Sequence, residues 1–265
     1  MHISITRDLS DSRAARLRRI AGYGPAIVLG VSLLVLWELY VRSGVISQRV
    51  LPSPLIVAGT LYYNWDIIQE HTLQTLFETV LGLAASTVLG LLLAIVLNLA
   101  SWTRRAIYPL LIASQTVPII ALAPLFVTWM GFGLLPKIII VILYCFFPIA
   151  VASADGLLST DPDLLRLLAS MRASRWQTLW LVQLPGAMPA FFSGLRIAAT
   201  YSVSGAIVGE FVGAEKGLGN YMLTAGHSYA IAAVFAAIVV TTILSLLLFG
   251  LVSLVERLTL PWYTR

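Results

Sequence analysis

Residues 155–189 interrupt an otherwise strongly apolar chain and concentrate groups that can bind a partner. Its arginines and tryptophans lie close together: Arg166, Arg172, Arg175, Trp176 and Trp180. A charged, helical segment in the middle of a membrane chain implies a task outside the membrane. One interpretation is a docking element that inserts into a groove of a soluble protein and receives force from it. The other is an amphipathic loop at the lipid surface, where arginines meet anionic headgroups.

A second group of polar side chains falls inside the apolar stretches. Placing a carboxylate such as Glu210 inside the membrane costs free energy, and such a group usually faces a cavity or a partner. A structural hydrogen bond to neighbouring backbone and a gate or pathway role both remain open for it. Gln115, Thr116 and Pro118 place polar groups and a helix break within another apolar run. Broken helices at membrane depth often line cavities, although simple kinking is the alternative.

Three further residues complete the candidate substrate pathway. Tyr201 and Ser204 share the apolar run of Glu210, and the ring of Tyr201 or Trp129 would stack on a flat heterocyclic ligand. The predicted pathway set is therefore Gln115, Thr116, Pro118, Trp129, Tyr201, Ser204 and Glu210.

The sequence lacks the motifs of common catalytic and metal sites. His2, His71 and His227 have no metal-ligand spacing, and neither His-Glu-x-x-His nor Gly-x-Ser-x-Gly occurs. A P-loop needs Gly-Lys-Ser or Gly-Lys-Thr to hold phosphates, whereas the two lysines follow Pro136 and Glu215. We therefore predict no catalytic residue, no metal site and no ATP hydrolysis in this chain.

Composition places the chain among membrane proteins. It is 59% hydrophobic and 11% charged, whereas soluble domains average about 25% charged residues. A single cysteine, Cys145, excludes a disulfide framework within the chain. We expect one transmembrane domain over residues 1–265.

Six stretches are apolar and long enough to cross a bilayer, which takes about 20 residues per helix. The predicted fold is therefore an all-α integral membrane protein with six transmembrane helices and a cytoplasmic two-helix coupling loop. The spans are expected at roughly 22–41, 75–100, 107–130, 137–154, 189–213 and 230–256.

The distribution of arginine and lysine predicts the orientation, because cytoplasmic loops carry an excess of both. With the N-terminus inside, 13 of the 17 basic residues lie on the inner side. The outer side then holds the other 4, Arg42, Arg49, Lys137 and Lys216. We therefore expect both termini, the tail 1–21 and the loop 155–188 in the cytoplasm.

Local signals within this loop predict two short helices. Asp161 suits a helix N-cap and Pro162 the first helical position, which predicts a helix over 162–171. Ser174 and Gln177 have the spacing of a capping box that starts a second helix. We expect Leu184-Pro185 to end that helix and an elbow to form near Arg172.

Small residues recur four apart on two of the predicted spans, a spacing that lets helix backbones approach closely. Packing within one subunit and a subunit interface or sliding surface are both consistent with it. The stripes are Gly205, Gly209 and Gly213 on the fifth span, and Gly82, Ser86, Gly90, Ala94 and Asn98 on the second.

The cytoplasmic loop resembles the EAA loop of ABC importer permeases, whose pattern is Glu-Ala-Ala, three residues, Gly, nine residues, Ile-x-Leu-Pro. Residues 182–185, Val-Gln-Leu-Pro, match its end. This alignment places Arg172 at the family glycine and residues 166–168, Arg-Leu-Leu, at the triplet, so both signature elements are substituted. Arginine at the turn glycine implies either a turn without positive φ or a strained one that costs about 1 kcal/mol or more.

The resemblance covers most of the chain, from Leu51 to its end. Segments 51–54, 115–118, 123–125, 129–133 and 209–219 are similar to the taurine, sulfonate and nitrate branch of these permeases. Segments 146–149, 191–194 and 199–203 look closer to permeases for thiamine-precursor pyrimidines or riboflavin.

The resemblance implies a type I importer of the bacterial inner membrane. Two permease copies would form the pathway for a small organic solute by alternating access in the lipid membrane, with no role for nucleic acid. Two separate ABC ATPases, which carry ATP and Mg, would bind the elbows, and a periplasmic or extracytoplasmic binding protein would deliver the ligand. The predicted coupling residues are Arg166, Met171, Arg172, Ala173, Ser174 and Arg175.

Two other classes are less well supported by the residues. A secondary transporter or channel would work without an ATPase, but the spans hold few charges for ion coupling. An intramembrane enzyme would need a catalytic set deep in the spans, and the sequence contains none.

Overall fold

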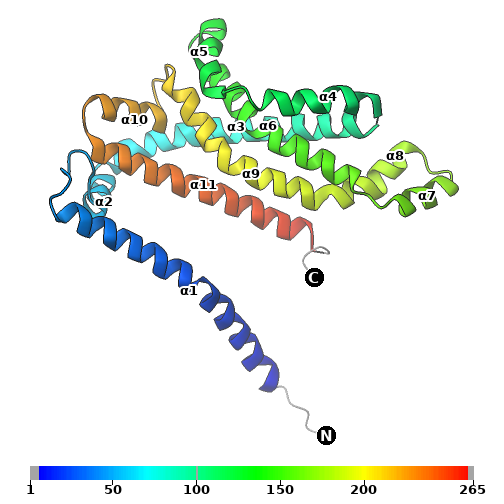
Figure 1. Cartoon of the computed structure of the whole chain (residues 1–265), viewed down its shortest axis with the longest axis horizontal. Coiled ribbons are helices and arrows are strands. Elements are labelled where there is room, and N and C mark those ends of the chain that lie inside the picture. Colours follow the sequence, from blue (N-terminus) through cyan, green and yellow to red (C-terminus); the bar gives the residue numbers. More distant parts are fainter. Residues whose placement is uncertain (1–5, 100, 262–265) are drawn as a thin grey trace.

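The computed structural model describes residues 6–99 and 101–261, and every regular element in these ranges is helical (Figure 1). The α-helices are α1 (Thr6–Arg42), α2 (Pro54–Tyr63), α3 (Trp65–Leu99), α4 (Ser101–Ser114), α5 (Ile119–Met130), α6 (Leu134–Leu158), α7 (Pro162–Ser170), α8 (Arg175–Thr178), α9 (Leu184–Phe211), α10 (Leu218–His227) and α11 (Ile231–Thr259). A π-helical turn, η1 (Leu179–Gln183), joins α8 to α9.

Within the described residues, five helical segments are long and apolar enough to cross a membrane, and a bent pair of helices brings the number to six when the pair is counted as one span. The predicted fold is thus confirmed. The five are Gly24–Arg42, Trp65–Leu99, Leu134–Leu158, Arg175–Phe211 and Ile231–Thr259. The bent pair is α4 with α5, whose axes meet at 96°.

The predicted third span, 107–130, is therefore not one straight helix. Pro118 precedes α5 with extended backbone, φ −69° and ψ 104°, and contributes no N–H to a helix. A proline also disfavours helical geometry in the residue before it, which separates α4 from α5 at this point.

Helix α6 lies at the centre of the bundle, packed most extensively against α9 on one side and α3 on the other. Its Val141, Cys145 and Ile149 are fully buried in the main hydrophobic core. Residues of α9 and α11, such as Val203 and Leu248, complete that core.

Glycines on α3 and α9 allow this close packing. A Cβ atom added at Gly90 would lie 2.8 Å from the Ile149 side chain, and one at Gly205 would lie 3.1 Å from the Tyr144 ring. Gly209 faces the backbone of Lys137 in the same way. The glycines Gly82, Gly90, Gly205 and Gly209 of the two predicted stripes therefore pack against α6 of their own chain.

Gly213 does not belong to the stripe to which the sequence assigned it. Helix α9 ends at Phe211, and Gly213 adopts φ 110° in the turn that follows. Only glycine adopts this φ readily, and the position lies close to the ring of Phe132.

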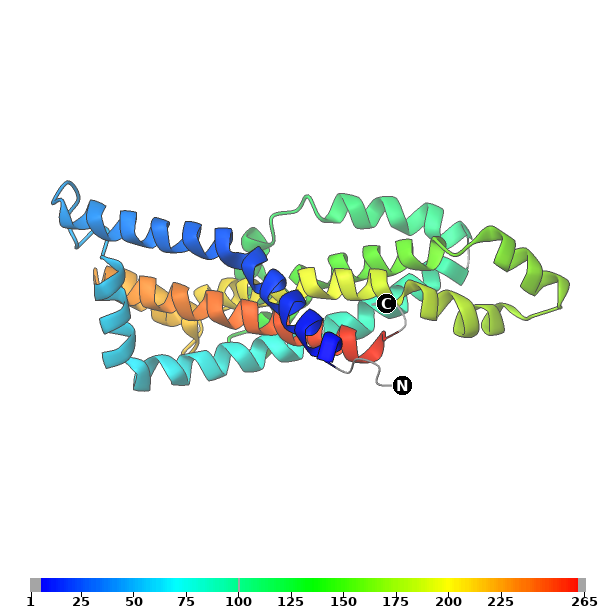
Figure 2. The same cartoon turned by 90° about the horizontal axis from the view of Figure 1, so that it is seen from below.

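Helix α1 runs apart from the core helices and bends near its middle, where it contains Pro25 (Figures 1 and 2). Its Trp37 ring contacts Phe235 of α11, with ring centroids 5.8 Å apart. Residues 6–21 of the predicted tail form the first part of this helix, and residues 1–5 lie outside the described ranges.

The two ends of the bundle differ in structure (Figure 1). One end carries α7 and α8 and is called the elbow end, whereas the other carries α2 and α10 and is called the α10 end.

We expect Gly194→Ala to lower the thermal unfolding midpoint in detergent, because the added Cβ would lie 2.5 Å from the backbone oxygen of Pro148. Overpacking of this kind typically costs about 1–3 kcal/mol. Gly250→Ala on α11 is the matched control, since no heavy atom lies within 4 Å of its Cβ position. Equal midpoints for the two variants would contradict this account of the α6–α9 contact.

Candidate functional site

The two arms of the elbow start as the sequence predicts. The Asp161 side chain accepts a hydrogen bond from the Asp163 N–H at 2.8 Å, at the start of α7. Ser174 and Gln177 form the complete capping box of α8. Gln177 N donates to Ser174 Oγ at 3.2 Å, and Ser174 N donates to Gln177 Oε1 at 2.7 Å.

The turn between the arms has the geometry of a glycine turn although Arg172 occupies it. Arg172 has φ 56°, so the turn with positive φ is the one that forms. Its N–H donates to Ala169 O, and Ala173 N–H donates to Leu168 O, both at 3.0 Å. These two bonds define a Schellman motif, which usually has glycine at this position. Left-handed backbone costs an L-residue about 1–2 kcal/mol, and the hydrogen bonds hold it in place.

The second arm does not end at Leu184-Pro185 as predicted. Helix α8 continues through η1 into α9, and Leu184 N–H donates to Leu179 O, five residues earlier. A proline removes one helical donor and crowds the preceding turn, and the wider π turn accommodates this disruption. The second arm and α9 therefore form one continuous helical segment.

All six predicted coupling residues lie on this elbow, and α7 has no buried residue. Met171 is 71% exposed, and Arg166 forms an ion pair with nearby Asp163, at 3.1 Å. By contrast, Leu179 at the base of the elbow is fully buried in a core cluster with Leu157. The structure thus presents an exposed tip on an anchored base.

Two hydrogen bonds connect the second arm to α3. Asn98 Nδ2 donates to Gln183 Oε1 at 2.8 Å, and Arg175 Nη1 donates to the carbonyl oxygen of Leu99 at 3.4 Å. A cavity of about 320 Å³ separates the elbow from the end of α3 beside these bonds. Sequence reasoning missed the pair of Asn98 and Gln183, because each is an ordinary polar residue near a span end.

Two predicted pathway residues come together at the break between α4 and α5. Gln115 and Tyr201 line one cavity of about 220 Å³, called here the pathway cavity. Its other lining residues are Ile119, Leu143, Tyr144, Phe147 and Pro148. The lining is mostly apolar and aromatic, and it carries one amide and no charged group.

The remaining pathway candidates do not line this cavity. Thr116 Oγ1 donates to Ala113 O at 2.7 Å within the break, and Pro118 caps α5. Trp129 on α5 is 68% exposed, and Ser204 is exposed one turn after Tyr201 on α9.

Glu210 is buried at the α10 end, with 1% of its surface exposed. Its Oε1 accepts from Thr75 Oγ1 at 2.6 Å, and its Oε2 accepts from Gly219 N at 2.5 Å. Thr75 Oγ1 also accepts from Leu218 N at 2.8 Å. The structure thus places Glu210 in a structural network that caps the start of α10 and not in the pathway cavity.

His71 completes this cap. Its Nδ1 lies 3.0 Å from Gly217 N, which donates to it. Its ring packs on Tyr221 with centroids 5.3 Å apart, and burial raises the pKa of the Tyr221 hydroxyl. Three side chains from α3 and α9 therefore accept the first N–H groups of α10, which would otherwise lack partners.

A buried ion pair at the same end was missed by sequence reasoning. Lys137 Nζ lies 2.8 Å from Glu78 Oε1, and Glu78 is fully buried. Gln74 Nε2 donates to the same oxygen at 2.7 Å. The sequence does show two opposite charges in two apolar helices, which could have indicated an ion pair. However, 59 residues separate Glu78 from Lys137, so no local pattern connects them.

We expect Lys137→Met to destabilise the protein strongly, because it leaves the buried Glu78 carboxylate without its counter-charge. Removing one partner of a buried pair typically costs about 3–5 kcal/mol. The double variant Glu78→Gln/Lys137→Met should recover most of the loss, as measured by thermal unfolding in detergent. A double variant as unstable as the single one would show that the ion pair is not the cause.

The fold is that of a helical membrane protein with an exposed elbow at one end. Residues 86–260 match the family of binding-protein-dependent transport system inner membrane components, and the chain belongs to this family. It is the transmembrane permease subunit of an ABC importer and not an enzyme, and the ATPase is a separate protein.

Curated relatives match over nearly their whole length. The formylaminopyrimidine transport permease ThiX of Halalkalibacterium halodurans is 40% identical over 87% of this chain and 92% of its own. The riboflavin transport permease RibX of Chloroflexus aurantiacus is 33% identical over 90% and 91%. The taurine transport permease TauC of Escherichia coli is 34% identical over 87% and 86%.

A solved structure shows the same fold. The MetNI methionine ABC transporter in an inward-facing conformation superposes with a TM-score of 0.60. The match has 20% sequence identity and covers 71% of this chain and 95% of that one.

Proposed function

We propose that this permease imports a small planar nitrogen heterocycle of the pyrimidine or flavin type. The observation that carries this proposal is the pathway cavity, where Tyr144, Phe147 and Tyr201 supply aromatic rings and Gln115 an amide. Aromatic rings stack on flat heterocycles, and an amide donates and accepts hydrogen bonds in their plane. The names of the ThiX and RibX relatives agree with this class.

A sulfonate or nitrate substrate is the second candidate, favoured by the match to TauC. An anion of this kind is usually held by arginine, lysine or several N–H donors. The pathway cavity has no basic residue, which favours the heterocycle.

The elbow is proposed to lie in the cytoplasm and to bind the ABC ATPase. The arginines at the elbow end support this orientation by the positive-inside rule: Arg104, Arg105, Arg166, Arg172 and Arg175. Both termini then lie inside, and the α10 end faces the extracytoplasmic binding protein. ATP and Mg²⁺ act on the ATPase chain.

The continuous helix from α8 to α9 suggests how the elbow acts on the pathway. The ATPases close on ATP and move the elbows together. Because α8, η1 and α9 are joined without a loop, this movement reaches Tyr201 on α9 directly. The pathway then opens alternately to the two sides of the membrane.

A second copy of the chain is proposed to cover the exposed face of α4 and α5. These helices expose large apolar side chains near the pathway cavity, such as Ile112, Ile120 and Leu125. Helix α5 packs only against α6 and α9 to any extent among the described elements. A homodimer would bury this face and enclose the cavity between its two subunits.

We expect Tyr201→Ala to reduce heterocycle uptake by about threefold to tenfold, in line with the loss of one aromatic contact. The measurement is ATP-driven uptake of a labelled formylaminopyrimidine into proteoliposomes that contain permease and ATPase, supplied with the binding protein. Tyr201→Phe should keep most uptake because it keeps the ring. Tyr40→Ala, which removes an exposed tyrosine ring of α1 outside the pathway cavity, is the control. Unchanged uptake by Tyr201→Ala would remove Tyr201 from the pathway.

We expect Arg172→Glu/Arg175→Glu to uncouple ATP hydrolysis from transport, because it reverses two charges at the elbow tip. Uptake should fall at least tenfold while the ATPase loses its stimulation by the loaded binding protein. The control is Arg104→Glu/Arg105→Glu, which makes the same charge change at the elbow end but on α4. In this variant, ATP hydrolysis should remain coupled to transport. Normal transport by the elbow variant would exclude this turn as the ATPase contact.

A further inference from the structure

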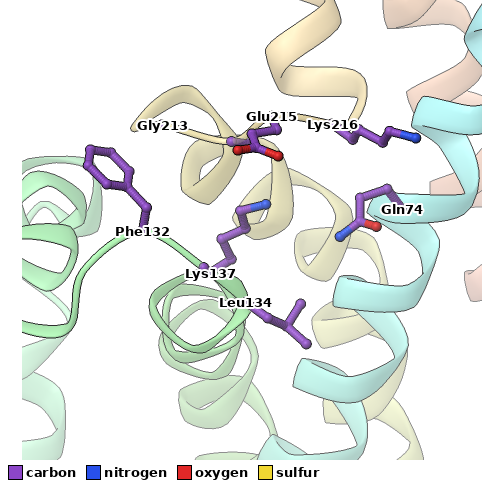
Figure 3. A pocket seen from close by; sticks show the side chains of 9 residues that line it. Gln74, Phe132, Leu134, Lys137, Gly213, Glu215 and Lys216 are labelled. Atoms are coloured by element: carbon purple, nitrogen blue, oxygen red, sulfur yellow. The ribbon is translucent and has the colours of Figure 1, made fainter.

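A second cavity, of about 610 Å³, opens at the α10 end and is called here the outer cavity (Figure 3). It shares no lining residue with the pathway cavity. Cavities of about 300–1,000 Å³ are the usual size for small-molecule sites. Its lining residues are Gln74, Phe132, Gly133, Leu134, Lys137, Gly213, Ala214, Glu215 and Lys216.

Lys137 supplies a buried ammonium group at this cavity and is only 8% exposed. It donates one hydrogen bond to Glu78, and an ammonium has three N–H donors, so two remain available. Glu78 balances its charge at 2.8 Å, so the lysine can donate to a neutral or an anionic acceptor.

Two acceptors face the same space. Glu215 at the rim is exposed, and in Figure 3 the Lys137 side chain rises toward it while Gln74 faces both from α3. Gln74 uses its Nε2 on Glu78, which leaves its amide oxygen free to accept from a ligand. Lys137 and Glu215 line one cavity but form no ion pair with each other, so there is room between them.

Lys216, the other charged lining residue, points away from Lys137 and Glu215 in Figure 3. Its Nζ lies 3.5 Å from Glu70 Oε2, and both side chains are exposed. Lys137 and Glu215 are therefore the two charged residues that face the cavity. Lys137 is a hydrogen-bond donor and Glu215 is an acceptor.

We propose that the outer cavity binds the transported solute before it enters the pathway, through an acceptor group on the solute and an amino group near it. The acceptor is bound by Lys137, and the amino group donates to Glu215 and to the Gln74 amide oxygen. The inference rests on the proposed import function and narrows the substrate class to amino-bearing solutes. A formylaminopyrimidine, with its carbonyl, and taurine, with its sulfonate, share this chemistry.

The test is equilibrium binding to the permease–ATPase complex in lipid nanodiscs, without ATP and without the binding protein. Labelled formylaminopyrimidine and labelled taurine are the two probes. We expect saturable binding of one of them, and about tenfold weaker binding by Glu215→Gln, which keeps the shape and removes the charge. Asp66→Asn, an exposed carboxylate outside the cavity, is the matched control. The probe that binds identifies the acceptor as carbonyl or sulfonate.

A second variant tests the base of the cavity without leaving a lone buried charge. Glu78→Gln/Lys137→Gln removes both charges together, and we expect it to weaken binding while Asp66→Asn, outside the cavity, does not. Absence of saturable binding for both probes, or equal affinity in Glu215→Gln, would overturn the outer site.

Uptake by the same complex separates this result from the proposed function. Uptake that depends on Tyr201 in a complex that binds neither probe would leave the proposed function standing and exclude the outer site. If neither probe is taken up, formylaminopyrimidine and taurine are both excluded as substrates, whatever the binding result.

Discussion

The close approach of α6 to α3 and α9 is the contact on which the rest of the structure depends. Lipid provides no hydrophobic force between helices, so packing must come from backbones that fit tightly. Gly90 and Gly205 make this fit possible on the two sides of α6. One helix thereby positions three sites: Lys137 at the outer cavity, Tyr144 at the pathway cavity and Leu157 beneath the elbow.

Features that depend on neighbouring residues were predictable from the sequence. Asp161 and Ser174 start their helices through bonds to groups two or three residues away, so their signal is complete within a short window. The apolar runs likewise predict the spans, because each must satisfy its own backbone in lipid. The structure confirmed the fold class, and the match of residues 86–260 confirmed the family resemblance.

Features that depend on distant partners were not predictable. Glu210 bonds to Thr75, which lies 135 residues earlier, and Glu78 pairs with Lys137 across two helices. No local pattern distinguishes such a buried carboxylate from a pathway residue, so both interpretations of Glu210 stayed open until its partners were known. The prediction that the second elbow helix ends at Pro185 was wrong for a different reason. A proline usually ends a helix, but here the π turn before it lets the helix continue.

Arg172 shows that the shape of the elbow and its charge are separate properties. Two backbone hydrogen bonds stabilise the turn. The turn therefore keeps its geometry although its position of positive φ carries an arginine instead of a glycine. In the proposed complex this guanidinium stands at the apex that enters the partner. The groove that receives it must then provide room and a hydrogen-bond acceptor. In an ATPase whose groove fits a turn with glycine at this position, the bulky, positively charged side chain of Arg172 would occupy space that the groove does not provide. Compatibility between this permease and an ATPase is thus determined by the chemistry of one side chain as well as by the shape of the turn.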